Sequence, residues 1–277
     1  MTLKSVLITG CSAGGIGFAL VEAFQKRNLH VFATARDPSK MSQLDKIPNV
    51  TLLSLDPTSP ASVQTAVETV RAQTGGTLDY LVNNAGQTTI MPTLDFDIET
   101  AKEMYDINVW GMVRVTQEFA PLLVAAKGTL VSIGSISTSV ITPWMGVYAG
   151  SKAAMTAITE ALRLELAPLG VAVVTVNTGA VKTNGLANGT NFKLPPNSMY
   201  KSIEKDIAGR ARGEDGTPRM VPSVYAEKVV GDIMGGARGQ IWRGGYASIV
   251  RFALSKLPVL VTDWVFIQKT GLDVIKT

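Results

Sequence analysis

A glycine-rich turn follows the first apolar run of the chain, in the sequence Ser5-Val6-Leu7-Ile8-Thr9-Gly10-Cys11-Ser12-Ala13-Gly14-Gly15-Ile16-Gly17. The run 5–9 is typical of a buried strand, and Ile16, Leu20 and Phe24 recur at helical spacing. Glycines at such a turn permit positive φ and close backbone approach, and a helix N-terminus attracts anions. The turn therefore predicts a nucleotide-phosphate site. A merely flexible loop is the alternative, because the glycines do not follow the usual G-x-G-x-x-G pattern.

The composition indicates one well-filled globular domain over residues 1–277. Hydrophobic residues make up 46% of the chain and charged residues 17%, and no linker or internal repeat divides it. With His30 as the single histidine and Cys11 as the single cysteine, a metal site, a Ser-His-Asp hydrolase and an internal disulfide are all disfavoured. The lone cysteine, and a first strand that begins close to Met1, favour a cytoplasmic location.

Charge and hydropathy restrict the possible partners. The net charge of +4 suits an anionic ligand such as a phosphorylated cofactor, but the basic residues are dispersed, which disfavours nucleic-acid binding. An apolar extension is expected at about 245–277; charged residues and a proline interrupt its most apolar part, 247–267, so a spanning helix is disfavoured. Packing against the core or a partner, and peripheral contact with a lipid surface, are the remaining interpretations.

Strand-like and helical segments alternate along the chain. The expected strands are 5–9, 30–34, 50–55, 78–82, 128–133, 171–176 and 241–244. Between them lie helical patterns, including a long one over 97–126 and one that begins near Tyr148. This order predicts an α/β fold with a doubly wound parallel sheet of the Rossmann type, helices on both faces, and a ligand crevice at the carboxyl ends of the strands.

The end of the second strand indicates which dinucleotide binds. An acidic residue about twenty positions beyond the glycine turn selects NAD, whereas a nearby arginine accommodates the 2′-phosphate of NADP(H). Here the strand ends in Thr34, Arg36 follows, and Ser12 on the turn adds a hydroxyl donor. We therefore expect NADP(H). Two alternatives stay open: Arg36 as a solvated loop charge, and Asp37 turned inward to select NAD.

Tyr148 and Lys152 form the candidate catalytic pair. Four positions apart on an expected helix, they share a face, so an ammonium would lie near a phenol and lower its pKa. This makes Tyr148 a candidate general acid, although such pairs are also common on helix surfaces. Ser135 supports the assignment, because it ends a strand beside that helix and can hydrogen-bond a carbonyl oxygen; otherwise it is a turn residue.

Together these motifs resemble the short-chain dehydrogenase/reductase family. The residues that carry the resemblance are Thr9-Gly10 through Gly17, Asp56, Asn83-Asn84-Ala85-Gly86, Asn108, Ser135, Tyr148-x-x-x-Lys152, and Thr178-Gly179 to Thr183. Ser135 precedes Tyr148 by 148 − 135 = 13 positions, the family's usual interval. The chain departs from the family pattern twice: its glycine turn is one residue longer, and Thr178 stands where the family usually has proline.

The resemblance implies a role for each matching residue. Tyr148 would donate a proton to a substrate carbonyl, Lys152 would hold the nicotinamide ribose, and Ser135 would orient the carbonyl. Asn108 would support a proton-relaying water, unless it bonds its own helix. Asp56 would face the adenine, and Val181 and Thr183 would approach the nicotinamide carboxamide. The implied cofactor site also includes Gly10, Gly15, Ile16, Gly17, Asn83, Ala85 and Gly86.

A narrower resemblance is to fungal reductases of the 1-acyl-dihydroxyacetone-phosphate reductase type. It rests on the two departures and on Ala33-Thr34-Ala35-Arg36 and Ile241-Trp242-Arg243-Gly244. It implies an NADPH-dependent reductase acting on a lipophilic ketone, either an acyl-dihydroxyacetone phosphate or a secondary-metabolite ketone, and assembled as a homodimer or homotetramer. An NAD-dependent alcohol dehydrogenase and a non-catalytic dinucleotide-sensing regulator are the alternatives.

Substrate choice is expected to lie in the segment at about 184–222. This segment is rich in glycine, asparagine and proline, and loops of such length often act as lids. Its arginines, which could meet a substrate phosphate or only solvent, are Arg210, Arg212 and Arg219.

Overall fold

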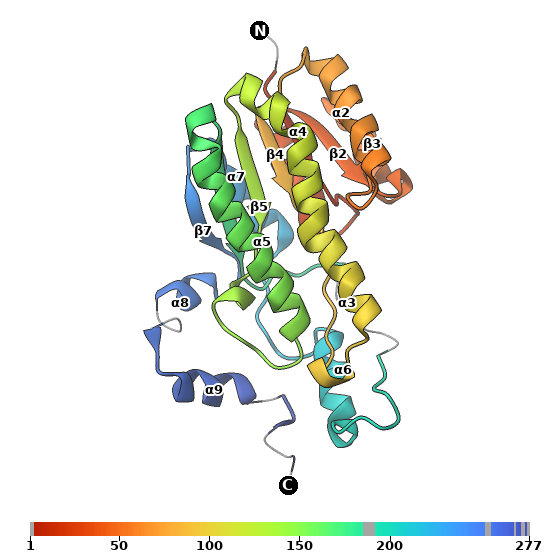
Figure 1. Cartoon of the computed structure of the whole chain (residues 1–277), viewed down its shortest axis with the longest axis vertical. Helices are drawn as coiled ribbons and strands as arrows, with labels where there is room; N and C mark the ends of the chain where they lie inside the picture. The colour runs from red at the N-terminus through yellow and green to blue at the C-terminus, as the bar shows by residue number, and fades with distance from the viewer. Residues whose placement is uncertain (1–2, 185–191, 253–255, 269, 273–274, 276–277) are drawn as a thin grey trace.

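A parallel sheet forms the centre of the molecule (Figure 1). The computed structural model describes residues 3–184, 192–252, 256–268, 270–272 and 275. Within these residues seven strands run parallel in the order β3-β2-β1-β4-β5-β6-β7. The strands are β1 (Ser5–Ile8), β2 (His30–Ala35), β3 (Val50–Ser54), β4 (Tyr80–Asn83), β5 (Thr129–Ile133), β6 (Ala172–Thr178) and β7 (Gly239–Arg243). The predicted fold class and the expected strands are confirmed, with boundaries that differ by two residues or fewer.

Helices cover both faces of the sheet, as its apolar strands require. One core cluster packs α1 and α7 against the sheet through residues such as Phe24 and Tyr225. The other packs α2, α4 and α5 against the opposite face through Val63, Phe119 and Leu162. In Figure 1, α4 and α5 lie in front of the sheet and α7 behind it. The bounds of these helices are α1 (Ile16–Gln25), α2 (Pro60–Thr74), α4 (Met112–Ala126), α5 (Gly146–Glu165) and α7 (Pro222–Met234).

The strand order places a ligand crevice beside β1. The chain moves outward from β1 through β2 to β3 and then returns to the other side of β1 with β4. At such a switch point, the loops that follow the two central strands diverge to opposite faces and leave a crevice at their carboxyl ends. The glycine turn follows β1 and the Asn83–Gly86 motif follows β4, so the fold brings two predicted cofactor segments to this point.

The long helical region expected over 97–126 is confirmed, but it is not one uniform α-helix. It is divided into α3 (Ile98–Tyr105), a π-helical segment η3 (Asp106–Gly111) and α4. A π-helical turn accommodates an extra residue and re-aims the side chains within it, and such turns are frequent at functional sites. Here the re-aimed residue is Asn108.

Three helices of the chain beyond β6, which are α6, α8 and α9, lie below the sheet in the view of Figure 1, whereas α7 and β7 belong to the sheet layers. The predicted lid falls partly on residues 185–191, and the predicted extension partly on 253–255, 269, 273–274 and 276–277, which lie outside the described residues. The described elements there are η7 (Lys201–Ile203), α6 (Glu204–Ala211), α8 (Ala247–Phe252) and α9 (Val259–Ile267). Short helices elsewhere are η1 (Pro38–Leu44), η2 (Thr93–Asp95), η4 (Ile136–Thr138) and η5 (Ala167–Leu169). Within the described ranges, every helix is too short or too polar to cross a bilayer.

Candidate active site

The glycine turn between β1 and α1 has the backbone form that a phosphate site needs. Gly10 and Gly14 have φ of +72° and +74°, a region that side chains disfavour. A Cβ atom on Gly10 would lie 2.8 Å from the Cα of Ala85, so the turn packs directly on the segment after β4. Among the described residues, no side chain caps α1, whose N-cap is Gly15. The first N–H groups of α1 are therefore available to an anion, and the turn fits a dinucleotide diphosphate.

Thr9 and Asn84 fasten this turn to the end of β4. The Thr9 hydroxyl accepts hydrogen bonds from the N–H groups of Asn84 and Ala85 at 3.0 and 2.9 Å. The Asn84 amide donates to the carbonyls of Thr9 and Gly10 at 2.8 and 3.0 Å. Sequence analysis quoted both residues within motifs but gave neither a role. The available signal was a polar residue directly after each of two adjacent strands.

The end of β2 presents Arg36 rather than an acid. The Thr34 hydroxyl is buried and donates to the Ile8 carbonyl at 3.1 Å, and Arg36 is exposed. Asp37 accepts hydrogen bonds from Ser39 N–H at 3.0 Å and Ser39 Oγ at 2.7 Å, which cap η1 and lower the pKa of the Asp37 carboxyl. The alternative of an inward Asp37 is therefore not the arrangement that the structure has.

Ser135 stands just beyond the end of β5 with its hydroxyl oriented by a neighbour. Ser135 is buried, and its Oγ accepts hydrogen bonds from the N–H and Oγ of Ser137 at 3.2 and 2.9 Å. Ser137 was missed by sequence analysis. The signal was the Ser-x-Ser spacing, in which the first hydroxyl can hydrogen-bond the backbone two residues on.

Lys152 reaches from α5 to the same strand end. Its buried ammonium donates to the carbonyl of Ile133 at 2.9 Å, two residues before Ser135. Burial lowers the pKa of Lys152 to about 8. A Cβ atom on Gly86 would lie 3.5 Å from Lys152 Nζ and 3.2 Å from Asn108 Oδ1. The backbone after β4 thus comes close to the lysine and to Asn108.

Tyr148 lies one helical turn before Lys152 on α5 and beside Ser135. Burial raises the pKa of its phenol, and a hydrogen bond with the Ser135 side chain lowers it by less. The net direction is opposite to the lowering by Lys152 that we predicted, because the removal of the phenol from water outweighs the favourable interactions. Tyr148 is consequently protonated at neutral pH, the form that a proton donor needs.

Asn108 links three segments of the site. Its Oδ1 accepts from Gln87 N–H at 2.8 Å, and its Nδ2 donates to the Gln87 carbonyl and to Ser151 Oγ, each at 2.9 Å. Ser151 in turn donates to the Tyr148 carbonyl at 2.7 Å. The alternative that Asn108 bonds its own helix is therefore wrong, because the π-helical turn directs it across to α5. Gln87 and Ser151 were missed, since nothing local marks them.

Two other predicted cofactor residues use their side chains internally. The Asp56 carboxylate accepts from the N–H and hydroxyl of Thr58 at 2.9 and 2.8 Å through one oxygen, so its other oxygen is the one left for an adenine. Asn83 is buried, and its amide donates to Thr116 Oγ1 on α4 at 2.9 Å. Its side chain thus joins β4 to α4, and contact with a dinucleotide would fall to its main chain.

The loop after β6 returns to the glycine turn. Val181 is buried beside Met220, and Thr183 is partly buried. Asn184 donates from its backbone N–H to the Gly14 carbonyl and from its amide to the Ala13 carbonyl, both at 3.3 Å. The predicted nicotinamide loop and the predicted phosphate turn therefore lie side by side.

Thr178, where the family usually has proline, anchors the start of this loop. Its hydroxyl lies 2.6 Å from the hydroxyl of Tyr225, a fully buried residue of α7. Burial raises the pKa of the Tyr225 phenol. The phenol is therefore protonated at neutral pH, and a proton is available for this hydrogen bond. The bond ties the start of this loop to α7.

The geometry agrees with comparisons to known proteins. A family model for short chain dehydrogenase matches residues 4–192, more than half of the chain. The chain belongs to the short-chain dehydrogenase family. It is 47% identical over 273 residues to the short-chain dehydrogenase ptmH of Penicillium ochrochloron, covering 99% of this chain and 100% of that protein. It is 41% identical over 208 residues to the NADPH-dependent 1-acyldihydroxyacetone phosphate reductase of Schizosaccharomyces pombe, covering 74% and 70%.

Solved structures of the same family share the fold. A short-chain dehydrogenase from Streptomyces avermitilis superposes with a TM-score of 0.79 at 25% identity, covering 95% of this chain and 96% of that one. A short chain dehydrogenase from Burkholderia cenocepacia, solved in complex with NADP, gives 0.75 at 24% identity, covering 96% and 99%. The chain is thus an oxidoreductase of a family that uses a nicotinamide dinucleotide.

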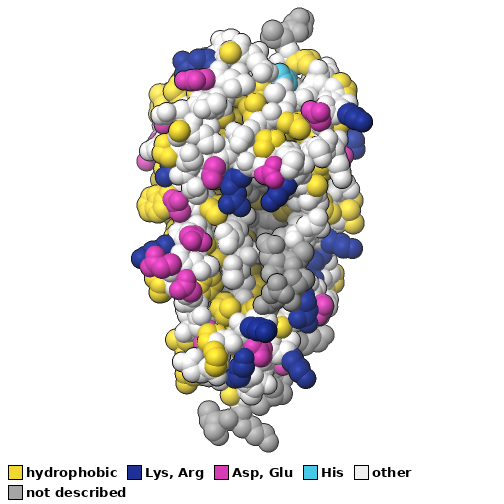
Figure 2. All heavy atoms as spheres, turned by 90° about the vertical axis from the view of Figure 1, so that its right-hand side faces the viewer, with side chains coloured by type: hydrophobic (Ala, Val, Ile, Leu, Met, Phe, Trp, Pro, Cys, Tyr) yellow, Lys and Arg dark blue, Asp and Glu magenta, His cyan; other side chains and the backbone are white. Residues whose placement is uncertain are grey.

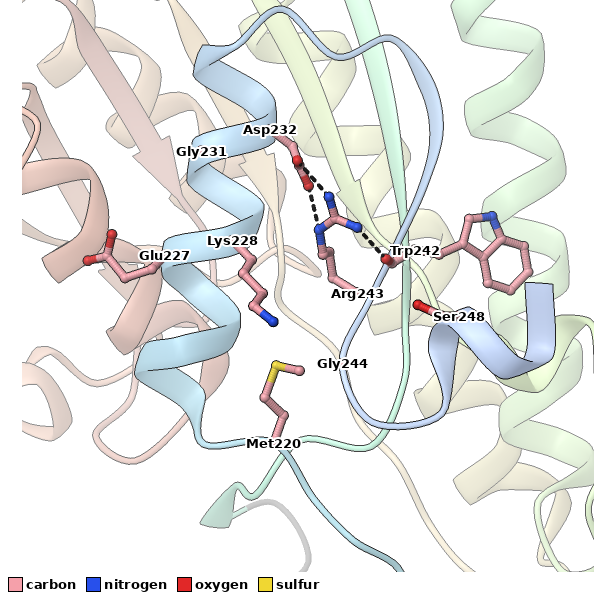
Figure 3. A pocket seen from close by; sticks show the side chains of 9 residues that line it. All are labelled: Met220, Glu227, Lys228, Gly231, Asp232, Trp242, Arg243, Gly244 and Ser248. Carbon is pink, nitrogen blue, oxygen red and sulfur yellow. Dashed lines mark hydrogen bonds and ion pairs between the residues drawn. The ribbon is translucent and has the colours of Figure 1, made fainter. Parts of the chain in front are cut away.

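A surface hollow of about 380 Å³, which shares Met220 with the loop after β6, lies between α7, β7 and α8 (Figure 3). Arg243 of β7 forms an ion pair with Asp232 of α7 at 2.7 Å and donates to the Trp242 carbonyl at 2.9 Å. The ion pair joins the edge strand to its covering helix. The Ile241–Gly244 segment, which supported the narrower resemblance, therefore has a structural role here.

Charged side chains on one face of the molecule are mixed. Figure 2 shows Lys and Arg beside Asp and Glu, without a large patch of either sign on that face. The described residues include ion pairs such as the one between Arg219 and Asp215 at 2.8 Å.

Proposed function

We propose that the chain is an NADPH-dependent carbonyl reductase that transfers a hydride to a lipophilic ketone while Tyr148 protonates the ketone oxygen. The observation that supports it most is the convergence of Ser135, Tyr148 and Lys152 beyond the end of β5, close to Gly86 and the glycine turn. A proton donor and a hydrogen-bonding hydroxyl close to the segment that packs on the glycine turn support the reduction of a carbonyl.

The residues divide the reaction between them. Ser135, oriented by Ser137, would hold the substrate carbonyl oxygen, and Tyr148 would donate its proton to that oxygen as the bond to carbon becomes single. Lys152 would hold the nicotinamide ribose, and Asn108 would keep the backbone at Gln87 in place. Reduced nicotinamide, when bound, supplies the hydride. The protonated phenol of Tyr148 suits the reducing direction.

NADP(H) is supported by the residues after β2. Arg36 is exposed next to the glycine turn, while the neighbouring Asp37 is engaged by Ser39 and the Thr34 hydroxyl by Ile8. A guanidinium without an acid in competition suits a 2′-phosphate. The relative from Schizosaccharomyces pombe is named as NADPH-dependent, which points the same way.

A lipophilic substrate is supported by an apolar cluster at the mouth of the crevice. It combines residues after β4, residues just before Tyr148, the expected lid, and the C-terminal segment. Its buried members are Ile90, Trp144, Leu194, Ile203, Ile207 and Ala211. Of the lid arginines, Arg212 is paired with Glu214 at 2.7 Å and Arg219 with Asp215 at 2.8 Å. Two of the three lid arginines are thus engaged within the lid, which favours a ketone without a phosphate over an acyl-dihydroxyacetone phosphate.

The test is NADPH consumption by the purified chain across a panel of lipophilic ketones, with and without phosphate groups. Tyr148→Phe removes the proton donor and is expected to lower kcat by about 10²–10⁴-fold while NADPH still binds. Tyr246→Phe, at an exposed tyrosine, is the control. Full activity of Tyr148→Phe would refute the mechanism, and tight NADPH binding without turnover of any ketone would indicate a regulator instead.

Cofactor choice has a separate test. Arg36→Ala is expected to weaken NADPH binding on the order of tenfold or more through the loss of a charge-assisted hydrogen bond, and to leave NADH binding unchanged. Asp37→Asn serves as the matched control at the next position. An unchanged NADPH preference in Arg36→Ala would discredit the role of that residue. The homodimer or homotetramer stays a prediction from the family resemblance.

A further inference from the structure

The C-terminal arm, defined here as α8 (Ala247–Phe252) and α9 (Val259–Ile267), exposes large apolar side chains. In α8, Ala247 and Val250 are buried and hold the helix to the body of the protein, but Ile249 and Phe252 are 51% and 65% exposed. In the described structure, α9 buries none of its residues. Figure 1 shows α9 beside the body rather than against the sheet. Such a concentration of exposed apolar surface marks an interaction site.

The exposed apolar residues of α9 point in every direction around its axis. Successive helical residues are turned by about 100°. Val259, Leu260 and Val261 therefore face three different sides, and they are 70%, 83% and 41% exposed. Trp264 and Val265, on the next turn, are 67% and 39% exposed. A protein groove would cover one side of such a helix and leave the others in water, whereas a lipid phase covers all of them.

The length and charges of the arm fit the surface layer of a bilayer. Nine residues span about 14 Å, half of what crossing would need. The charged groups near α9 are exposed: Arg251 and Lys256 precede the helix, and Asp263 is the one acid within it, so basic residues outnumber acidic ones at this end of the arm. Aromatic and basic side chains together favour the headgroup region, and the net charge of +4 favours anionic lipid.

The arm is also connected to the apolar cluster at the crevice. The Trp144 indole donates to the Thr270 carbonyl at 3.3 Å. Thr270 lies three residues after the end of α9, and Trp144 lies four residues before Tyr148. Leu272 and Ile275 pack against the same cluster. The segment after α9 therefore packs on an apolar cluster that includes Trp144, four positions before Tyr148, so an anchor at α9 would hold this cluster close to the membrane.

We propose that the C-terminal arm is an interfacial membrane anchor, with α9 immersed in the outer part of one leaflet of an anionic bilayer. The anchor does not depend on the reaction proposed above. It gives the arm a partner of defined chemistry, a lipid surface, instead of a second copy of the chain.

The test is flotation of the full-length protein with phosphatidylcholine vesicles, with and without phosphatidylserine. We expect the protein to float with both and more strongly with phosphatidylserine. Trp264→Glu is expected to weaken binding on the order of tenfold or more. The matched control is Leu164→Glu, because Leu164 on α5 is as exposed as Trp264, at 65% against 67%. Lys256→Gln should reduce only the phosphatidylserine-dependent part.

A second measurement keeps the test independent of the glutamate variant. On addition of vesicles the tryptophan emission should shift to the blue, and the shift should be absent in Trp264→Phe, which still floats. Consumption of NADPH with a water-soluble ketone reports that each variant is folded, and it should not change. Failure of the wild-type chain to float overturns the anchor. So does equal loss of binding in Leu164→Glu, or a fall in native mass of Trp264→Glu without vesicles, which would identify a second copy as the partner.

Discussion

The glycine turn and the C-terminal arm are built in opposite ways. Around the turn, polar groups are buried and paired: Thr9 with Asn84 and Ala85, and Thr34 with Ile8. In the arm, apolar side chains such as Leu260 stand in water. The first arrangement is rigid without a ligand, because each polar group already has its partner. The second is incomplete until something apolar covers it. A charged cofactor would thus be bound through polar groups that are already in place, whereas an apolar partner would be bound through the burial of exposed apolar side chains.

Lys152 provides the largest expected effect, because it is a buried charge in the rigid region. Lys152→Met should abolish turnover and, at pH 7, raise the free energy of unfolding by on the order of 3 kcal/mol. Between pH 8 and 10.5 the unfolded wild-type chain keeps a proton that the folded chain has lost, so rising pH stabilises the wild type. The difference in free energy of unfolding between the wild type and Lys152→Met should therefore narrow over this range, as measured by denaturant unfolding. Lys228→Met, at an exposed lysine, should have the same free energy of unfolding as the wild type. A difference for Lys152→Met that does not change with pH would contradict the buried charge.

Gly10 tests whether the turn is as rigid as its hydrogen bonds indicate. Gly10→Ala combines an unfavourable φ with a contact on Ala85, and should lower the free energy of unfolding by about 2 kcal/mol and weaken NADPH binding. Gly75→Ala is the matched control, since its φ of +68° is similar and nothing lies within 4 Å of the added atom. The free energy of unfolding of Gly75→Ala should fall by about 1 kcal/mol, and this variant should bind NADPH normally. Equal effects of the two changes would show that the turn yields to the added methyl group.

Ser137 tests a positioning effect within the same region. Ser137→Ala frees the Ser135 hydroxyl to rotate and should lower kcat by about tenfold, equivalent to about 1.4 kcal/mol, with little change in NADPH affinity. Ser137→Thr keeps the hydroxyl and should recover most of the rate. Ser139→Ala, at an exposed serine in the same loop, is the control. A rate defect shared by Ser137→Thr would mean that the site requires the size of serine rather than its hydroxyl.

Trp144 tests the link between the active site and the C-terminal arm, and its substitution has the smallest expected effect on kinetics. Trp144→Phe keeps an apolar ring but loses the hydrogen bond to Thr270, and should raise KM for a lipophilic ketone by about fivefold, since one neutral hydrogen bond is worth about 1 kcal/mol. NADPH affinity should not change. Trp242→Phe, beside the hollow between α7 and β7, is the control. A change in NADPH affinity rather than in ketone KM would mean that the glycine turn and the arm are not independent.

Much of the catalytic side was predictable because its signals are local. Tyr148 and Lys152 share a helix, and Ser135 follows a strand whose register the apolar pattern sets. The orientation of these groups was not predictable. Ser137, Ser151 and Gln87 determine it through hydrogen bonds, and the Asn108 amide reaches Ser151 across 43 positions of sequence only because η3 is π-helical.

The direction of the Tyr148 pKa was also beyond the sequence. Spacing places an ammonium one helical turn away, but the balance between that charge and loss of water depends on what covers the phenol. The same holds for the side chain of Asp37. Its position in the sequence is compatible with NAD or with NADP(H), and only the structure shows that Ser39 engages its carboxylate.

By itself, the sequence determined the alternation of strands and helices, the glycine turn, and the order of the reacting groups along the chain, because each depends on residues within one or two turns of each other. The tertiary structure decided which side chains those groups meet, which carboxylates are engaged, and that Thr270 reaches Trp144 across 126 positions. It also decided that α9 stays outside the core. These properties depend on packing between distant segments, and packing is set by the whole chain at once.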